Sequence, residues 1–284
     1  MYKYLIKLLL LVASLVWISV FMVDDHLHII ACDVGQGDAI LIQKNNTQIL
    51  IDGGPNKSVL DCLGSYMPFW DKTIELVIST HPELDHYGGL IDVVKTYNIK
   101  TYAHNGTTSS NQSYKVLESE MGSRDIPTMP VSKGMVVRLG LIYLDILNPE
   151  RTNTNPDSTD NSSNPNDDGV VVLLKYDQFK ALFTADVENK VSDSLSNLNS
   201  IQNINYIKVN HHGSKNGLSQ KLLDSTSPEI AVISVGKDNR YNHPDKMVLD
   251  ILNHLNVNIF RTDEIGNIEL ITNGITYWTS VKKR

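Results

Sequence analysis

THPELDHYGG, residues 80–89, is the stretch of sequence from which the rest of the chain is interpreted. It follows Glu75–Ser79, a short run with β-branched residues that predicts a buried strand, and it precedes Leu90–Val94, which opens a helical pattern. Its histidines and carboxylates therefore leave a strand end together. Imidazole and carboxylate groups in such a turn can converge on one or two divalent ions, although a solvated polar loop would also account for this stretch alone.

Other polar side chains also follow predicted strands. They lie in the turn Val34–Asp38, in Asp52–Gly54 after a hairpin, at Asp186 after the strand that begins at Phe179, and in Asn210–Ser214 after the strand Ile204–Val209. A strand-end aspartate such as Asp186 means little alone, but a carboxylate there can bridge two metal ions about 3.5 to 4 Å apart. The adjacent residues His211 and His212 are hard to explain by packing, because both imidazoles need polar partners if they point inward.

The polar run of residues 151–168 contains no large apolar residue, so it cannot bury a face. We expect it to form a mobile loop. Asp168 ends this run directly before the predicted buried strand Gly169–Leu174. It could be a metal ligand or an aspartate that simply starts the strand.

These motifs resemble a known family. Residues 80–89 are similar to the HxHxDH motif of the metallo-β-lactamase superfamily, and more closely to the HxDxDH variant in the hydrolase domain of ComEC-type competence proteins. Glu83 stands at the middle position, which puts a ligand of weaker zinc preference at one corner of the site. DVGQGDA (33–39), IDGG (51–54), HHGSK (211–215) and the segment RTDEIG (261–266) also resemble ComEC-type sequences.

The resemblance implies a fold of the α/β (α+β) class, the metallo-β-lactamase αββα sandwich, in which two stacked sheets carry helices on both outer sides. Composition alone would support only a mixed α and β protein. The similarity runs from about His26 to Trp278. We therefore expect a hydrolase domain over residues 26–284 and a separate N-terminal segment over residues 1–25.

The resemblance also implies a site for two divalent metal ions, zinc or manganese, although mixed nitrogen and oxygen ligands suit iron as well. The expected metal ligands are His81, Glu83, Asp85, His86, Asp168, Asp186 and His212. Asp85 is also a candidate catalytic residue that orients the nucleophile. His243 is the other, since it could donate a proton or bind phosphate, although it could equally be a helix-capping residue. His211, Ser214 and Lys215 are the expected contacts for substrate.

Residues 8–23 carry no charge, and with residues 4–7 they reach the roughly 20 residues needed to cross a bilayer. Lys3 and Lys7 precede this segment and two aspartates follow it, so the positive-inside rule places the remainder of the chain outside the cytoplasm. We expect a single-pass anchor in the cell membrane, preceding an extracytoplasmic catalytic domain. A cleaved signal peptide, and hence a secreted protein, is the alternative.

Length and composition set broad limits. With 284 residues, 41% of them hydrophobic, the chain can bury a substantial core. Its formal net charge of −7 gives no overall positive field to attract nucleic acid, so a nuclease hypothesis must rest on the site itself. Cys32 and Cys62 are too few for a disulfide scaffold, and their spacing fits no thiolate metal site.

Together these features favour a membrane-anchored metal-dependent hydrolase that acts on phosphodiesters, including DNA. Two divalent ions would activate a water molecule for attack on a phosphorus or carbonyl centre. Another ester, such as a cell-wall teichoic-acid phosphodiester, is an alternative substrate. A non-catalytic, metal-stabilised binding module is an alternative from a different class, because Glu83 weakens one corner of the site and the third-motif histidine is missing.

Overall fold

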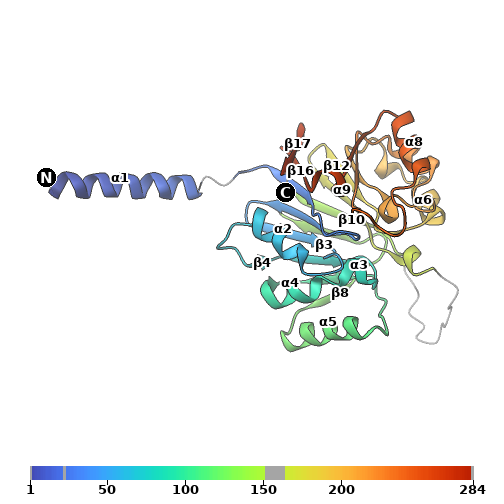
Figure 1. The fold of residues 1–284 in the computed structure, drawn as a ribbon, viewed down its shortest axis with the longest axis horizontal. Helices are drawn as coiled ribbons and strands as arrows, with labels where there is room; N and C mark the ends of the chain where they lie inside the picture. The colour runs from blue at the N-terminus through green and yellow to red at the C-terminus, as the bar shows by residue number, and fades with distance from the viewer. Residues whose placement is uncertain (1, 22–23, 151–163, 283–284) are drawn as a thin grey trace.

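Two β-sheets stacked face to face form the centre of the protein, and helices cover both outer faces (Figure 1). The computed structural model describes residues 2–21, 24–150 and 164–282. One buried apolar cluster lies between the sheets, a second lies between the first sheet and its helices, and a third lies between the second sheet and its helices. This arrangement is the predicted αββα sandwich.

The first sheet has eight strands among the described residues, in the order β17-β16-β1-β2-β3-β5-β7-β8. Its members are β1 (Leu27–Ala31), β2 (Ile40–Lys44), β3 (Thr47–Ile51), β5 (Leu76–Ser79), β7 (Tyr102–His104), β8 (Thr128–Pro130), β16 (Asn267–Thr272) and β17 (Tyr277–Lys282). Strands β3, β5, β7 and β8 run parallel to one another. Strand β5 lies between β3 and β7, and residues 80–89 begin at its carboxyl end.

The second sheet has seven strands within the part of the chain that the structure describes, in the order β15-β14-β13-β12-β11-β10-β9. They are β9 (Val136–Leu139), β10 (Ile142–Asn148), β11 (Val171–Tyr176), β12 (Phe179–Phe183), β13 (Tyr206–Lys208), β14 (Ile230–Ile233) and β15 (Asn258–Arg261). Strands β12 to β15 are parallel neighbours. Two short strands, β4 (Thr73–Ile74) and β6 (Asn98–Ile99), pair separately.

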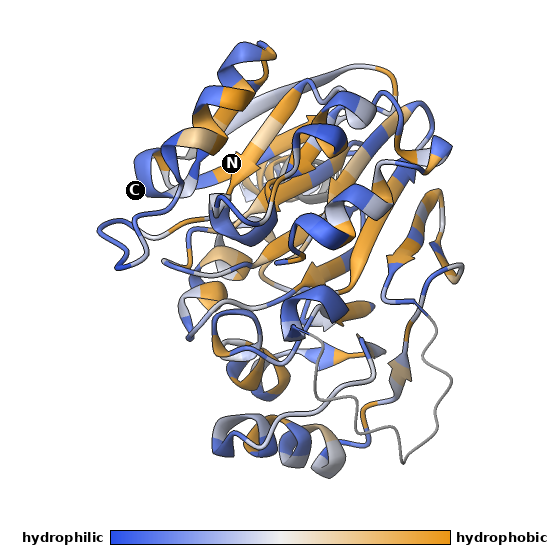
Figure 2. Ribbon diagram, turned by 90° about the vertical axis from the view of Figure 1, so that its right-hand side faces the viewer, coloured by the Kyte–Doolittle hydropathy of each residue, from blue (hydrophilic) through white to orange (hydrophobic). Residues whose placement is uncertain are grey.

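Amphipathic helices cover the sheets because each one buries an apolar stripe and leaves its other side polar (Figure 2). The first sheet carries α2 (Ser58–Tyr66), α4 (Leu90–Thr96) and α5 (Gln112–Ser123). The second carries α6 (Asn189–Leu195), α7 (Gln220–Thr226) and α8 (Lys246–His254). Two helices of one turn, α3 (Leu84–Tyr87) and α9 (Thr262–Ile265), interrupt the loops, and η2 (Asn199–Ile201) is a short 3-10 helix.

The N-terminal segment forms α1 (Tyr2–Phe21). Residues 22–23, the end of the predicted membrane span, lie outside the described residues. Among the described residues, no helix combines the length and the apolarity that crossing a bilayer requires. The membrane anchor therefore stays a prediction.

Two local features go beyond what the sequence predicts. Cys32, which follows β1, forms a disulfide with Cys62 of α2, and their Cα atoms lie 5.8 Å apart. The cysteine count gave no sign of this bond, because it depends on how α2 packs on the sheet. Most of the predicted mobile loop, residues 151–163, lies outside the described residues, but its end, Pro165–Asp168, forms the short 3-10 helix η1. Asn164 caps η1 by accepting the backbone N–H of Asn166, so this end of the run is ordered.

Candidate metal centre

Three strand ends bring the candidate ligands together. Strand β5 of the first sheet leads into His81–His86, whereas β12 of the second sheet leads to Asp186. Strand β13 leads into the 3-10 helix η3 (Asn210–Gly213), which carries His211 and His212. Because β12 and β13 are parallel neighbours, their carboxyl ends lie at the same edge of the sheet.

Glycines let two turns of the first sheet pack directly against residues 80–89, here called the motif loop. A Cβ atom at Gly37, which has φ +139°, would lie 2.2 Å from the Asp85 carbonyl oxygen, and a Cβ atom at Gly89 would lie 2.0 Å from the Gly53 carbonyl oxygen. Only glycine fits such approaches. The backbone N–H of Asp38 donates to that Asp85 carbonyl at 3.1 Å, so the DVGQGD turn holds the motif loop in place.

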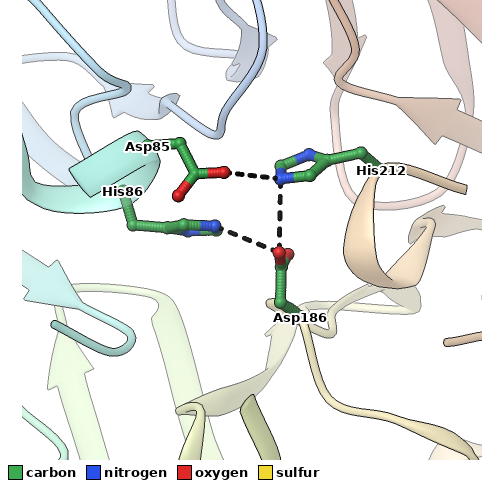
Figure 3. Close-up of side chains that lie close together, drawn as sticks. All are labelled: Asp85, His86, Asp186 and His212. Carbon is green, nitrogen blue, oxygen red and sulfur yellow. Dashed lines mark ion pairs between the residues drawn. The ribbon is translucent and has the colours of Figure 1, made fainter. Parts of the chain in front are cut away.

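Four side chains, here called the inner cluster, meet where these loops converge (Figure 3). They are Asp85, His86, Asp186 and His212, and each offers a ligand atom within 4.8 Å of the others. The Asp186 Oδ2 atom lies 3.3 Å from His86 Nε2 and 3.2 Å from His212 Nε2, while Asp85 Oδ2 lies 3.4 Å from His212 Nε2. His86, Asp186 and His212 are almost completely buried. This is a compact nitrogen and oxygen donor set of the kind that binds divalent transition metals.

Contacts at the Nδ1 atoms, on the side of each ring away from the cluster, orient both imidazoles of the inner cluster. His86 Nδ1 contacts Asp52 Oδ2 at 2.8 Å, and His212 Nδ1 donates to the Ser234 carbonyl oxygen at 2.9 Å. The Nε2 atoms of both rings are buried and form no hydrogen bond within the described residues. Buried imidazole nitrogens without such a partner are costly. A metal ion would satisfy them, because the second-shell contacts at Nδ1 turn the Nε2 lone pairs toward the cluster.

A buried lysine balances the carboxylates. Lys208 is 1% exposed, and its Nζ atom contacts Asp38 Oδ2 and lies 3.4 Å from Asp186 Oδ1. It also donates to the Ala185 carbonyl oxygen at 3.0 Å. Asp38 in turn lies 3.4 Å from His212 Nδ1 through its other oxygen. Asp186 therefore turns one oxygen toward Lys208 and the other toward the two imidazoles.

The ionisation of the inner cluster is strongly coupled. Burial alone would lower the pKa values of His86 and His212, but two carboxylates at each ring, Asp186 with Asp52 at His86 and Asp186 with Asp38 at His212, together raise both pKa values well above their ordinary range. Burial alone would raise the pKa of Asp186, but the two imidazoles and Lys208 hold that pKa well below its ordinary value. Without metal the cluster is thus a set of ion pairs, and a divalent cation would take the place of the imidazole protons.

His81 and Glu83, here called the outer pair, are less closely assembled. His81 is buried, its Nδ1 atom contacts Thr80 Oγ1 at 2.9 Å, and its Nε2 atom forms no hydrogen bond within the described residues. Burial and the neighbouring His86 lower the pKa of His81 to about 3, so this ring is neutral and ready to donate a lone pair. The Glu83 carboxylate is 45% exposed and lies 4.0 Å from His81 Nε2.

Asp168 is not one of the four residues of the inner cluster. It ends η1, and its backbone carbonyl oxygen accepts a hydrogen bond from Asn105 Nδ2 at 3.1 Å. Its role as a ligand stays a prediction.

The expected substrate contacts surround the inner cluster. His211 Nε2 lies 3.9 Å from Asp186 Oδ2, and the His211 and His243 rings meet edge to face with centroids 5.9 Å apart. His211 and His212 have φ values of 48° and 55°, a left-handed conformation that is uncommon outside glycine and that clusters at functional sites. Ser214 is buried and Lys215 is exposed.

Three further buried charged residues belong to the centre: Asp38, Asp52 and Lys208. The sequence had assigned none of them a role in the site. The DVGQGD and IDGG motifs were signals for the two aspartates, because both motifs end strands near the site. No comparable signal marks Lys208, since a lysine in the strand β13 would ordinarily be expected at the surface.

Comparisons with known proteins agree with the geometry. A profile of the metallo-beta-lactamase superfamily matches residues 32–128. The ComE operon protein 3 of Bacillus subtilis is 27% identical over 256 residues, which covers 84% of this chain and 32% of that protein. Recombination protein 2 of Haemophilus influenzae is 26% identical over 243 residues, covering 84% of this chain and 28% of that protein. The chain thus spans less than a third of the length of each relative.

Among solved structures, the metallo-beta-lactamase fold protein YhfI from Bacillus subtilis superposes with a TM-score of 0.55 at 10% identity, covering 89% of this chain and 100% of that chain. This likeness concerns the fold. The profile match, the two sequence relatives and the superposed sandwich together show that this chain has the metallo-β-lactamase fold and is a distant relative of ComEC-type competence proteins.

Proposed function

We propose that this protein is a divalent-metal-dependent phosphodiesterase that acts outside the cytoplasm, with DNA as its leading candidate substrate. The observation that carries the proposal is the inner cluster, in which two buried imidazoles, oriented from behind, face two carboxylates. The contacts that fix both Nδ1 atoms turn the two Nε2 atoms toward the same Asp186 oxygen, an arrangement in which one cation could replace both imidazole protons.

The residues present fit two cations, zinc or manganese. Asp85, His86 and His212 would hold one, His81 and Glu83 would hold the other, and Asp186 would lie between them. Divalent cations there would act as Lewis acids toward a phosphoryl oxygen and lower the pKa of bound water.

Protein groups around the cluster would set its charge and receive the substrate. Lys208 keeps Asp38 and Asp186 ionised, because its buried ammonium group contacts both carboxylates. Burial and the nearby His211 lower the pKa of His243, so this ring is neutral at pH 7. A neutral imidazole at the rim can donate a hydrogen bond to a phosphate oxygen.

Two observations support a location outside the cytoplasm. The Cys32–Cys62 disulfide is typical of proteins in oxidising compartments. The apolar α1, with exposed leucines at positions 8–11, is consistent with the predicted attachment to the membrane. DNA is proposed as the substrate because the motifs of this chain resemble those of ComEC-type competence proteins, and the sequence similarity to the ComE operon protein 3 agrees with that resemblance.

Metal analysis combined with turnover tests the proposal. The purified full-length protein would be treated with a chelator, reloaded with Mn²⁺ or Zn²⁺, and assayed on bis-p-nitrophenyl phosphate, single-stranded DNA and teichoic acid. Asp186→Asn should lose metal and turnover together. Asp145→Asn is the matched control, because Asp145 forms an ion pair with Lys175 at 2.6 Å and belongs to neither group of candidate ligands.

The substrate panel separates the alternatives. Hydrolysis of teichoic acid but not of DNA would move the protein to cell-wall chemistry. A wild-type protein that holds stoichiometric metal but hydrolyses no phosphodiester would instead be a metal-stabilised binding module.

A further inference from the structure

A pocket of about 280 Å³ lies directly beside the inner cluster. Its lining residues are Gln36, Pro55, Leu84, Asp85, Asn239, Arg240 and Tyr241. Asp85 belongs both to this pocket and to the inner cluster, so a group bound in the pocket would be next to the metal centre. Of the site residues expected from sequence, Asp85 is the one that lines this pocket.

Four segments of the chain line the pocket, and two of them, the turn at Gln36 and the loop that begins at Gly236, contact each other directly. The Gly236 N–H donates to Gln36 Oε1 at 3.2 Å, and a Cβ atom at Gly236 would lie 2.6 Å from the Gln36 backbone nitrogen. The Asn239 side chain then fixes the following loop, since it accepts from the Tyr241 N–H at 3.2 Å and donates to the His243 carbonyl oxygen at 2.7 Å. These hydrogen bonds and the close approach at Gly236 therefore hold this wall of the pocket in place.

A row of rings leads from the inner cluster to this pocket. His211, whose Nε2 atom lies 3.9 Å from Asp186 Oδ2, meets the His243 ring edge to face. The His243 ring in turn stacks on Tyr241, with centroids 5.7 Å apart and an interplanar angle of 25°. The Tyr241 side chain is 51% exposed, so the row ends at the surface.

A cation and an exposed apolar side chain complete the pocket. The Arg240 guanidinium lies 5.0 Å from the Tyr241 ring centroid and donates to the Tyr241 hydroxyl at 2.9 Å. Leu84, the first residue of α3, is 48% exposed although it is large and apolar. An aromatic ring, an aliphatic side chain and a guanidinium group are together suited to a flat ring that carries a nearby phosphate.

We propose that this pocket binds the base of a nucleotide next to the scissile phosphate, with Tyr241 and Leu84 contacting the base and Arg240 contacting a neighbouring phosphate. The inference rests on the proposed phosphodiesterase function and narrows its substrate to single-stranded nucleic acid. A duplex keeps its bases stacked and cannot place one in a side pocket without unpairing it. A polymer of glycerol or ribitol phosphate has no flat ring to fill the pocket.

A binding experiment tests the subsite independently of turnover. Fluorescence anisotropy would compare a phosphorothioate oligothymidylate with an all-abasic phosphorothioate strand of equal length and charge, using the full-length Mn²⁺-loaded protein. The wild type should bind the strand with bases about tenfold more tightly, the size expected for one base–aromatic stack. Tyr241→Ala should abolish this preference, and Tyr241→Phe should keep it.

Tyr143→Ala is the matched control. Arg138 lies 5.0 Å from the Tyr143 ring, the same spacing as in the Arg240–Tyr241 pair, but neither residue lines the pocket. This variant should retain the preference for bases. Equal binding of both strands by the wild type, or a preference that survives Tyr241→Ala, would overturn the subsite.

The subsite and the enzyme activity can fail separately. A Tyr241-dependent preference for bases in a protein that hydrolyses no phosphodiester would uphold the subsite and reject the proposed function. Hydrolysis of bis-p-nitrophenyl phosphate without any preference for bases would uphold the function and reject the subsite.

Discussion

The inner cluster and the outer pair are neighbours, but the fold positions their ligand atoms with different precision. In the inner cluster, four side chains from both sheets present ligand atoms within 4.8 Å of one another, and their imidazoles are fixed by hydrogen bonds from behind. The outer pair has one well-oriented imidazole, His81, but its second member, Glu83, is 45% exposed and 4.0 Å away. The difference indicates one cation position that the fold prepares in advance and a second that depends on a partly exposed carboxylate.

The largest expected effect comes from removing the buried cation that supports the inner cluster. Lys208→Met would leave Asp38 and Asp186 buried without their shared partner. Breaking a buried ion pair from one side costs about 3–5 kcal/mol of unfolding free energy. Urea denaturation of the chelator-treated protein would measure this loss.

Lys175→Met is the control for that measurement. Lys175 pairs with Asp145 at 2.6 Å but is 41% exposed, so its loss should cost no more than about 1 kcal/mol. Equal destabilisation by the two substitutions would contradict the role assigned to Lys208.

Next in size is a comparison of one histidine from each region. His212→Ala should lower the affinity for the first metal by at least about a hundredfold, because even second-shell losses cost about 10–100-fold. His81→Ala should leave the first metal in place and weaken only the second. Titration followed by elemental analysis of each variant would measure both affinities. An identical loss in the two variants would mean that the regions bind metal as one unit.

Proton release should distinguish the same two regions. The pKa values of His86 and His212 are raised, so both rings are protonated in the metal-free protein at pH 6.5 and must lose a proton to bind metal. Their ion pairs stabilise the metal-free fold fully below pH 6.5, and this contribution is lost as the pH rises through the raised pKa values. Over the same window, metal affinity should rise by about tenfold per pH unit for each proton displaced.

His81 provides the contrast, since with a pKa of about 3 it has no proton to release. Calorimetric titration of Mn²⁺ in two buffers of different ionisation enthalpy would count the protons. Uptake of the first metal without proton release would contradict the predicted charge state.

The smallest expected effect is at Glu83. Glu83→Gln should reduce occupancy of the second metal and lower turnover by less than about tenfold, because the exposed carboxylate contributes the least organised ligand. Metal stoichiometry and turnover of bis-p-nitrophenyl phosphate would be measured together. A loss as large as that of His212→Ala would show that the outer position is as essential as the inner one.

Much of this centre could be predicted from sequence, because its motifs resemble those of the metallo-β-lactamase superfamily. Asp85, His86, Asp186 and His212 were proposed as members of one site, and the structure brings them together. Their positions after short apolar runs place them at sheet edges, where loops meet. The αββα sandwich was likewise expected from the resemblance, since composition alone supports only a mixed α and β protein.

What could not be predicted depends on contacts between distant parts of the chain. Lys208 lies in an ordinary strand sequence, and its burial is possible only because Asp38 and Asp186 arrive from other loops. The Cys32–Cys62 bond depends on the packing of α2 against the end of β1. Tyr241 and Arg240 received no role from sequence, since nothing local indicates that their loop borders Asp85.

Anomalous X-ray scattering from crystals grown with Mn²⁺ would show whether the inner cluster binds metal. We expect a strong peak about 2.0–2.3 Å from both His86 Nε2 and His212 Nε2, together with Asp85 and Asp186 oxygens, and a weaker peak beside His81. A map with no peak between those two imidazoles, from protein that contains stoichiometric manganese, would contradict this expectation.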